Sequence, residues 1–481
     1  MTLAVVRLNF NLMNASTPTA HEPLPGGPLV IQTQGYTPKL WADRRAVFFT
    51  NVQGLFFDNE ALTETLIREF IHAESYGARL VPVMGLLYRG GGNAVVLESA
   101  PDPALCRYFS KDLGLTLPEL HVLSHADYLQ LGQSLKDGTE SPTHELISKL
   151  IAADMPLVDG FVTDSTVERI AQRLGKRTLS TSSGSRRGNN KLLLHQHLES
   201  VGLPLFDTKM AAHPGEVARC LEALAQTGFR RAVAKSALGA SGVGLLKLDT
   251  ANTQVQVPSA FFHEGPVMIQ GWIEPERDGI THIHSPSVQM FLDDEAVYLY
   301  DLTEQILSQN SVHEGNESPP PYRDRLPGIA TELFRQAGIA GRWLHAQGYR
   351  GTASADFLVT EFGSTGEFRA YVCEVNARLT GATYPSMLAR HFLPSGAWLM
   401  RNLMLKEATS GQAVLRYLEE HGHLFHPGMQ RGVIPENFIL DENGRVAKGQ
   451  FLCIGANTQE CHELLRHAER DLPIDWDYLK D

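Results

Sequence analysis

The stretch "YVCEVNARLTG" (371–381) alternates polar and apolar residues in a pattern that indicates a β-strand. Glu374, Asn376 and Arg378 occupy every second position, so a strand would present all three on one face. The residues between them, beginning with Cys373, would face the opposite way. A plain half-solvated strand is one interpretation of this pattern, because such strands are common.

The preceding segment "TASADFLVT" (352–360) argues against that interpretation. The turn-rich loop "EFGSTGE" joins it to the alternating strand. If the hairpin pairs Thr360 with Ala370, Asp356 lies directly opposite Glu374, with Cβ atoms about 5 Å apart. Two carboxylates so placed repel each other unless a cation lies between them, and the carbonyl of Asn376 completes a set of hard ligands suited to Mg²⁺. The pattern therefore favours a metal site, although a shift of one residue in the register would remove it.

A second pattern is the glycine-rich segment "KSALGASGVG" (235–244). Lys235 ends an apolar run, and Gly239, Ser241 and Gly242 follow it. Glycines allow backbone N–H groups to approach a phosphate closely. The segment lacks the Gly-Lys-Ser/Thr ending of a Walker A loop, and a strand rather than a helix should follow it. Taken alone, it is better explained as a flexible hairpin than as a nucleotide flap.

Two weaker features complete the set. The run "VMIQGWIE" (267–274) reads as a buried strand that becomes polar at its end, where the backbone could meet an adenine edge beside Ile273. By itself it is better explained as a core strand. Lys191 follows Asn190 at an expected helix start, which alone indicates little.

Length and charge limit the classes of protein that fit. A chain of 481 residues is too long for one compact core, and its net charge of −12 disfavours nucleic acid or an anionic membrane as the main partner. The five cysteines form no C-x-x-C pair, so neither a zinc knuckle nor a disulfide framework is indicated. Because no signal peptide or membrane-spanning run is evident, we expect a cytoplasmic protein.

The element pattern predicts three domains. Short apolar runs alternate with helical patterns over residues 1–185, which indicates an α/β domain. Residues 186–415 hold the motifs described above. Residues 416–481 form a small unit, with a hairpin across "DENG" (441–444) and a final helix near 458–471.

In combination, these motifs resemble the ATP-grasp superfamily over about residues 188–385. The most specific parts are "KSALGASGVG" and "SADFLV…CEVNARLTG". The remainder is similar to the peptide ligase branch of pheganomycin biosynthesis, in part through "RGVIPENFILDENGRVAKGQFLCIG" (431–455). The resemblance implies an α/β protein whose central part has the α+β ATP-grasp fold. A Rossmann-like pre-ATP-grasp domain would precede a two-lobed ATP-grasp domain and a small C-terminal α+β unit.

The resemblance also implies roles for individual residues on the nucleotide side. Lys191 and Lys235 would contact ATP phosphates, and the hairpin around Gly239, Ser241 and Gly242 would close over them. The adenine and ribose contacts would come from the end of the polar strand: Gln270, the backbone of Gly271 and Ile273, and the carboxylate of Glu274. Many relatives carry an acidic residue where this chain has Gly271, so the side-chain part of adenine recognition departs from the pattern.

On the metal side, the resemblance implies that Asp356, Glu374 and Asn376 hold Mg²⁺, or Mn²⁺ in its place. Arg378 and Lys235 would be catalytic, because they neutralise charge on the transferred phosphoryl group. The implied activity is an ATP-dependent ligase that activates a carboxylate as an acyl phosphate and couples it to an amine. The substrates would be small acids and amines, amino acids or peptides. A homodimer is common for this architecture.

Two alternatives remain open at this stage. One is another ATP-grasp enzyme, either carboxylase-like or a small-molecule kinase. The other is a nucleotide-binding module without turnover, which the joint presence of both lysines, the three metal-ligand candidates and Arg378 disfavours. The sequence names neither the acid nor the amine.

Overall fold

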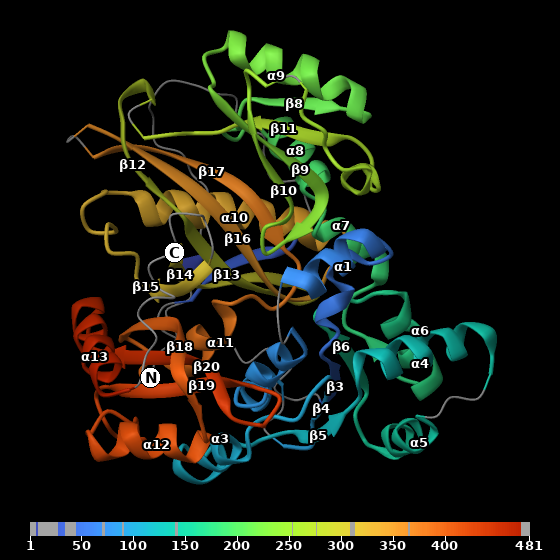
Figure 1. Ribbon diagram of the computed structural model, residues 1–481, viewed down its shortest axis with the longest axis vertical. Helices are drawn as coiled ribbons and strands as arrows, with labels where there is room; N and C mark the ends of the chain where they lie inside the picture. The colour runs from blue at the N-terminus through green and yellow to red at the C-terminus, as the bar shows by residue number, and fades with distance from the viewer. Residues whose placement is uncertain are drawn as a thin grey trace. The chain divides into compact units, whose positions relative to one another are not determined.

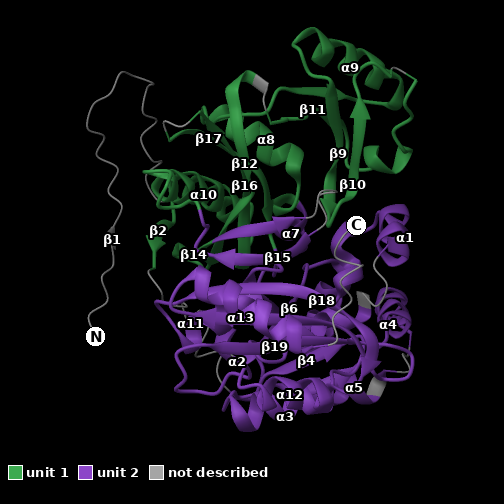
Figure 2. Cartoon of the chain, turned by 60° about the vertical axis from the view of Figure 1, so that its left-hand side comes forward, with its two compact units in different colours: residues 1–34, 187–302, 322–377 green, residues 35–186, 303–321, 378–481 purple. Residues whose placement is uncertain are grey.

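Figure 1 shows the helices and strands of the computed structural model, which divides into two compact units (Figure 2). Unit 1 comprises residues 1–34, 187–302 and 322–377, and unit 2 comprises residues 35–186, 303–321 and 378–481. The described residues are 6–7, 27–33, 45–69, 73–88, 91–139, 143–252, 254–275, 277–307, 313–363 and 366–472. The boundaries of the three predicted domains stay a prediction.

The larger part of unit 1 is a mostly antiparallel sheet built around β16 (Gly351–Phe362). This strand pairs with β12 (Ile280–His284), β13 (Pro286–Leu292) and β17 (Glu367–Asn376). β13 is followed in the sheet by β14 (Ala296–Leu307), which pairs in parallel with β2 (Leu29–Gln32), itself paired with β1 (Val6–Arg7). α10 (Ile329–Ala346) packs on the sheet through buried Leu333, Ala337 and Leu344. The polar ends of β16 and β17 are therefore held by a well-packed core.

The smaller part of unit 1 is a four-stranded sheet with the order β10-β9-β11-β8. Its strands are β8 (Thr208–Ala211), β9 (Arg231–Ala240), β10 (Val243–Asp249) and β11 (Val267–Gly271). α9 (Val217–Gln226) covers this sheet (Figure 1), and its buried residues recur at helical spacing because one face packs on the strands. α8 (Lys191–Ser200) begins at Asn190, whose side chain accepts a hydrogen bond from the Leu193 amide at 3.0 Å.

The N-terminal part of unit 2 confirms the expected Rossmann-like arrangement. Five parallel strands lie in the order β5-β4-β3-β6-β7. The strands are β3 (Ala46–Phe49), β4 (Ala94–Leu97), β5 (Glu119–Val122), β6 (Leu157–Gly160) and β7 (Arg177–Thr178). The helices are α1 (Glu60–Glu69), α2 (Met84–Leu87), α3 (Pro103–Arg107), α4 (His125–Asp137), α5 (His144–Ala152), α6 (Ser165–Leu174) and α7 (Ser182–Gly188), with a 3₁₀ segment η2 (Ala73–Leu80). The central strands β3 and β4 are fully buried, as is usual where helices cover both faces of a parallel sheet.

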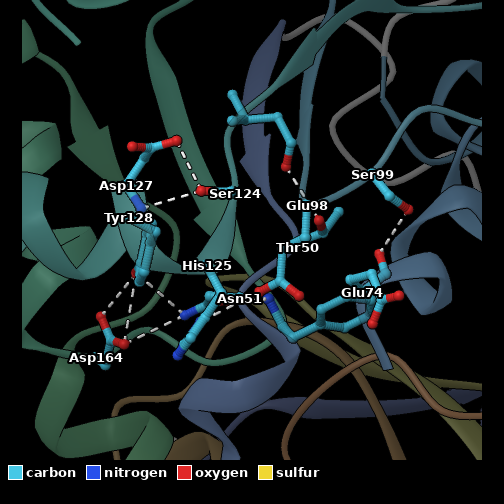
Figure 3. A network of polar contacts seen from close by, with 12 residues as sticks. Thr50, Asn51, Glu74, Glu98, Ser99, Ser124, His125, Asp127, Tyr128 and Asp164 are labelled. Atoms are coloured by element: carbon cyan, nitrogen blue, oxygen red, sulfur yellow. Dashed lines mark hydrogen bonds and ion pairs between the residues drawn. The ribbon is translucent and has the colours of Figure 1, made fainter. Parts of the chain in front are cut away.

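A polar network links the carboxyl ends of these strands to the helices that follow (Figure 3). Asn51, just after β3, donates from Nδ2 to the Val162 carbonyl at 3.0 Å and to Asp164 Oδ2 at 3.3 Å. Asp164 in turn accepts from the Val167 amide at 2.8 Å and so begins α6. These hydrogen bonds satisfy the buried Asn51 side chain and join the end of β3 to the turn that begins α6.

The C-terminal part of unit 2 is an antiparallel sheet with the order β15-β18-β20-β19, in which the last residues of β14 pair with β15. The strands are β15 (His313–Ser318), β18 (Ala397–Thr409), β19 (Gly432–Leu440) and β20 (Val446–Gly455), and the helices are α11 (Thr383–Phe392), α12 (Gly411–Glu420) and α13 (Thr458–Asp471). The predicted hairpin and final helix are confirmed as β19–β20 and α13. Among the described residues, no helix is both long enough and apolar enough to cross a membrane.

Candidate active site

The predicted carboxylate pair is present where β16 and β17 meet. Asp356 is directly opposite Glu374, as expected, but the predicted pairing of Thr360 with Ala370 is wrong because Thr360 lies opposite Arg369. The register shifts between Asp356 and Phe357, where the partners are Glu374 and Val372, so Cys373 is an extra residue in β17. This bulge restores the carboxylate pair that a regular ladder in the observed register would have lost.

Hydrogen bonds orient the oxygen donors of this face. Asp356 Oδ1 accepts from Ser287 Oγ at 2.6 Å and from Ser354 Oγ at 3.1 Å, and its Oδ2 accepts from Asn376 Nδ2 at 2.8 Å. Because the Asn376 amide nitrogen is directed at Asp356, its carbonyl oxygen is the end that remains for another partner. Sequence analysis missed Ser287, whose role depends on the pairing of β13 with β16.

Lys191 connects three parts of the site in unit 1. From the first turn of α8, its ammonium group lies 2.7 Å from Glu374 Oε2 and donates to the Gly239 carbonyl at 2.6 Å. The helix start thus contacts both the carboxylate face and the glycine hairpin. A residue with little sequence signal of its own therefore lies beside two other predicted parts of the site, and its contact with ATP phosphates stays a prediction.

Lys235, on β9, is the second cation at this face. Burial lowers the pKa of its ammonium group below the usual value, and the nearby Cys373 and Glu374 side chains offset this only in part. Burial also raises the pKa of the Cys373 thiol to about 12, so this group is neutral near pH 7. The prediction that Cys373 faces away from the site is wrong. Cys373 is the extra residue of the bulge, and its thiol lies close enough to Lys235 and Glu374 to interact with them electrostatically.

The glycine segment is a tight hairpin between β9 and β10. Ser241 and Gly242 form its two-residue tip with φ of 52° and 84°, the left-handed conformations that short hairpin turns require. A Cβ on Gly239 would lie 2.8 Å from the Val243 carbonyl, so this position has no room for a side chain. Leu238 and Val243 are buried. Within residues 237–244, only Ser241 and Gly242 at the tip are exposed.

Two solved structures are similar in fold to this chain. An N5-carboxyaminoimidazole ribonucleotide synthetase in complex with ADP matches with a TM-score of 0.51 and 12% identity, over 95% of this chain and 100% of the other. A biotin carboxylase from Campylobacter jejuni matches with a TM-score of 0.55 and 12% identity, over 90% of this chain and 92% of the other. Both are ATP-grasp proteins. The chain has the ATP-grasp fold.

One curated relative supports the same assignment at the level of sequence. A "[Butirosin acyl-carrier protein]--L-glutamate ligase" from Niallia circulans is 28% identical over 208 residues, which cover 41% of this chain and 44% of the relative. The match therefore spans less than half the length of that relative. No protein-family model matches the chain. The narrower similarity to the pheganomycin branch stays a prediction.

The predicted adenine strand of the ATP-grasp fold is β11. Gln270 is buried at its end and donates from Nε2 to Thr208 Oγ1 at 3.1 Å. Gly271 donates its amide hydrogen to the Asp207 carbonyl at 2.9 Å, and a Cβ there would lie 2.4 Å from the Phe229 ring. The Phe229 ring occupies the space that an acidic side chain would need, which explains this departure from the ATP-grasp pattern. The backbone of Ile273 lies beyond the end of the strand.

Glu274 is held by arginines. Arg231 donates from Nε to the Glu274 carboxylate at 2.7 Å, and Arg230 Nε lies 3.8 Å from the same carboxylate. These residues also line an open cavity of about 720 Å³ together with Phe229 and Asp249. A ribose contact from Glu274 stays a prediction, and it would compete with the Arg231 ion pair.

Arg378 follows the site strand in the sequence and belongs to unit 2. Within that unit its charge acts on the hydroxyl of Tyr384, the second residue of α11. The structure thus places Lys191, Lys235, Asp356, Glu374 and Asn376 together in unit 1. The catalytic role of Arg378 stays a prediction.

Proposed function

We propose that this protein is an ATP-dependent carboxylate–amine ligase. The observation that carries the proposal is the β16–β17 face, where Asp356, Glu374 and Asn376 lie beside Lys191 and Lys235 within an ATP-grasp fold. The carboxylates of this face suit a metal ion, and its lysines suit the phosphates of a nucleoside triphosphate. The ligase named among the relatives supports amide formation as the reaction, with an amino acid or peptide as one substrate.

The donor set fits Mg²⁺. Two carboxylates and an amide carbonyl are all oxygen ligands, and Ser287 and Ser354 hold the Asp356 carboxylate in place. When bound, Mg²⁺ supplies positive charge that offsets the developing charge on the phosphate oxygens. The Lys191 ammonium group forms an ion pair with the Glu374 carboxylate. When the metal binds, this ammonium group must either share the carboxylate with the metal or move away from it.

The proposed chemistry has two steps. A carboxylate oxygen of the acid attacks the γ-phosphorus of ATP, the bond to the bridging oxygen breaks, and ADP leaves. An amine then attacks the acyl carbon, phosphate leaves, and the amine loses a proton to give the amide. Lys191 and Lys235 position the phosphates by charge, and Arg378 would neutralise the transferred group. The β9–β10 hairpin would exclude water, which would otherwise hydrolyse the acyl phosphate.

The two alternative activities differ from the ligase in the acceptor. In a kinase-like reaction a small molecule accepts the phosphoryl group, and in a carboxylase-like reaction a small molecule or cofactor accepts the activated carbon. The structures that share the fold include carboxylating enzymes, so the fold alone does not choose among these reactions. A cytoplasmic location and a homodimer stay predictions. The ligase is favoured because the curated relative is named for ligation of L-glutamate.

The products provide the first test. Incubation with ATP, Mg²⁺ and pools of amino acids should yield ADP, phosphate and an amide, with turnover only when acid and amine are both present. Mass spectrometry of the mixture would detect the amide. Amide formation with AMP and pyrophosphate would contradict the acyl-phosphate route. ATP binding without turnover in any pool would favour the nucleotide-binding module.

A second test concerns the hairpin tip. The amides of Ser241 and Gly242 are exposed and should exchange with deuterium quickly in the nucleotide-free protein, because few buried contacts hold them. A non-hydrolysable ATP analogue should slow this exchange, since the amides gain phosphate partners. The buried residues Leu238 and Val243 serve as internal references. Equal exchange at the tip with nucleotide bound would contradict its role as a flap.

A further inference from the structure

Unit 2 contains an arginine and a glutamate side chain that are buried but not paired with each other. Arg79 lies on η2 and Glu436 on β19, and their exposed fractions are 3% and 1%. Neither oxygen of the Glu436 carboxylate has a hydrogen-bond partner among the described residues, and the same holds for Nη2 of Arg79. The two groups interact electrostatically, but no ion pair joins them within the described part of the chain. Buried polar groups without hydrogen-bond partners are costly, so their presence here calls for an explanation.

A second β-bulge sets the direction of the Glu436 side chain. In the β19–β20 ladder, Pro435 pairs with Phe451 and Asn437 with Gln450, so Glu436 is the extra residue. Bulges redirect a side chain and often occur beside functional sites. The next residue, Asn437, donates from Nδ2 to the Ser75 carbonyl of η2 at 3.3 Å. This contact holds the bulge against the segment that carries Arg79.

The guanidinium of Arg79 is fixed in orientation. It lies over the Tyr76 ring at 3.2 Å from the ring centre and over the Tyr384 ring at 4.6 Å, and its Nε donates to the Tyr76 carbonyl at 3.3 Å. Two aromatic rings therefore stack on the cation while one edge, at Nη2, keeps a free donor. A planar guanidinium held in this way is suited to bind a carboxylate.

The other titratable groups near the pair come from β20, α11 and β15. On β15, burial lowers the pKa of His313 to about 4, and the charges of Arg79 and Lys448 act on it in the same direction. Lys448 adds positive charge near Arg79, and burial lowers the pKa of both cations. Burial raises the pKa of the Glu436 carboxyl from its usual 4.5 to about 8, against the opposing effect of Arg79. The side chains of Glu436 and Arg378 both act electrostatically on the pKa of the Tyr384 hydroxyl. The Arg79 and Glu436 side chains therefore lie in the same electrostatic neighbourhood as the arginine that the resemblance places in catalysis.

We propose that Arg79 and Glu436 bind a free α-amino acid, with Arg79 holding its carboxylate and Glu436 its ammonium group. This inference rests on the proposed ligase and identifies an amino acid rather than a peptide as one of its substrates at this site. A zwitterion would satisfy both unpartnered groups at once, and neither an acid nor an amine alone would do so. Because both side chains are buried, binding requires the segment around η2 and β19 to open.

Ligand binding by the full-length protein tests the proposal. Thermal unfolding of the wild type and of Glu436→Gln should be measured with each proteinogenic L-amino acid, and with the N-acetyl and methyl ester derivatives of any that binds. At least one free amino acid should stabilise the wild type, and both derivatives should fail to do so. Glu436→Gln should raise the Kd of that amino acid about 100-fold, because it removes a charge-assisted contact. The exposed Glu442→Gln, in the turn after β19, is the matched control.

The stability of the variant without ligand separates this role from a structural one. Because the carboxyl pKa is raised by burial, the wild type should lose stability relative to Glu436→Gln as pH rises from about 4.5 to about 8. Glu436→Gln should therefore unfold at a higher temperature at pH 8. A lower unfolding temperature, with no amino acid bound by the wild type, would mean that Glu436 only balances Arg79, and would overturn the proposal.

Failure of this proposal is distinguishable from failure of the ligase. If ADP and an amide form and Glu436→Gln leaves the KM for every substrate unchanged, the amino-acid site is wrong and the ligase stands. If no substrate pool supports turnover but an amino acid still stabilises the wild type and not Glu436→Gln, the site stands and the ligase is wrong.

Discussion

Glu374→Gln should reduce the rate of ligation at least 100-fold, which corresponds to about 3 kcal/mol of transition-state stabilisation. The substitution keeps the size and most contacts of the side chain but removes the charge that faces Asp356 across the β16–β17 ladder. Loss of that charge weakens the proposed Mg²⁺ site, and added Mg²⁺ should recover part of the rate. Initial rates measured over a range of Mg²⁺ concentrations provide the test.

The fold should survive this substitution. Removing the charge relieves the repulsion between Glu374 and Asp356 but also weakens the pair with Lys191, which is partly exposed and contributes about 1 kcal/mol or less. The two effects oppose each other, so the free energy of unfolding should change little. Glu367→Gln, at the exposed start of the same strand, is the control. Near-normal activity of Glu374→Gln at low Mg²⁺ would exclude Glu374 as a ligand.

The carboxylate pair illustrates how far the sequence can predict the site. Alternation of residue type placed Asp356 and Glu374 on facing strands, and the observed ladder confirms that they are opposite each other. That prediction assumed that Thr360 lies opposite Ala370, whereas Thr360 lies opposite Arg369. A bulge at Cys373 supplies the missing residue, and a bulge leaves no distinctive mark on a pattern of period two.

Long-range packing accounts for what the sequence did not indicate. Gly271 was recognised as unusual, but the Phe229 ring that excludes a side chain there is 42 residues away in the chain. Glu436 lies in the apolar run "GVIPENFIL", which predicts a strand and gives no reason to connect it with Arg79. Such contacts depend on how separate elements pack together, and local periodicity carries no information about them.

Lys235→Met should raise the Kd for ATP by about 100- to 1000-fold, or about 3–4 kcal/mol, because a charge-assisted contact to phosphate is lost. The same substitution should stabilise the nucleotide-free protein. Burial lowers the pKa of Lys235, so the folded state disfavours its charged form, and that cost is present at neutral pH, below the usual lysine pKa. Methionine has a similar length and no charge to desolvate. Calorimetric titration with a non-hydrolysable ATP analogue and thermal unfolding measure the two effects.

Lys191→Met should behave differently in the nucleotide-free protein, and this contrast makes the prediction specific. Lys191 already pairs with Glu374 and donates to the Gly239 carbonyl, so its loss leaves a carboxylate and a carbonyl without their partner. The free energy of unfolding should fall by about 1 kcal/mol, the usual range for a partly exposed ion pair. Both variants should lose affinity for nucleotide. If Lys235→Met kept its affinity while Lys191→Met lost it, only the lysine of α8 would contact phosphate, and Lys235 would serve the packing of β9 instead.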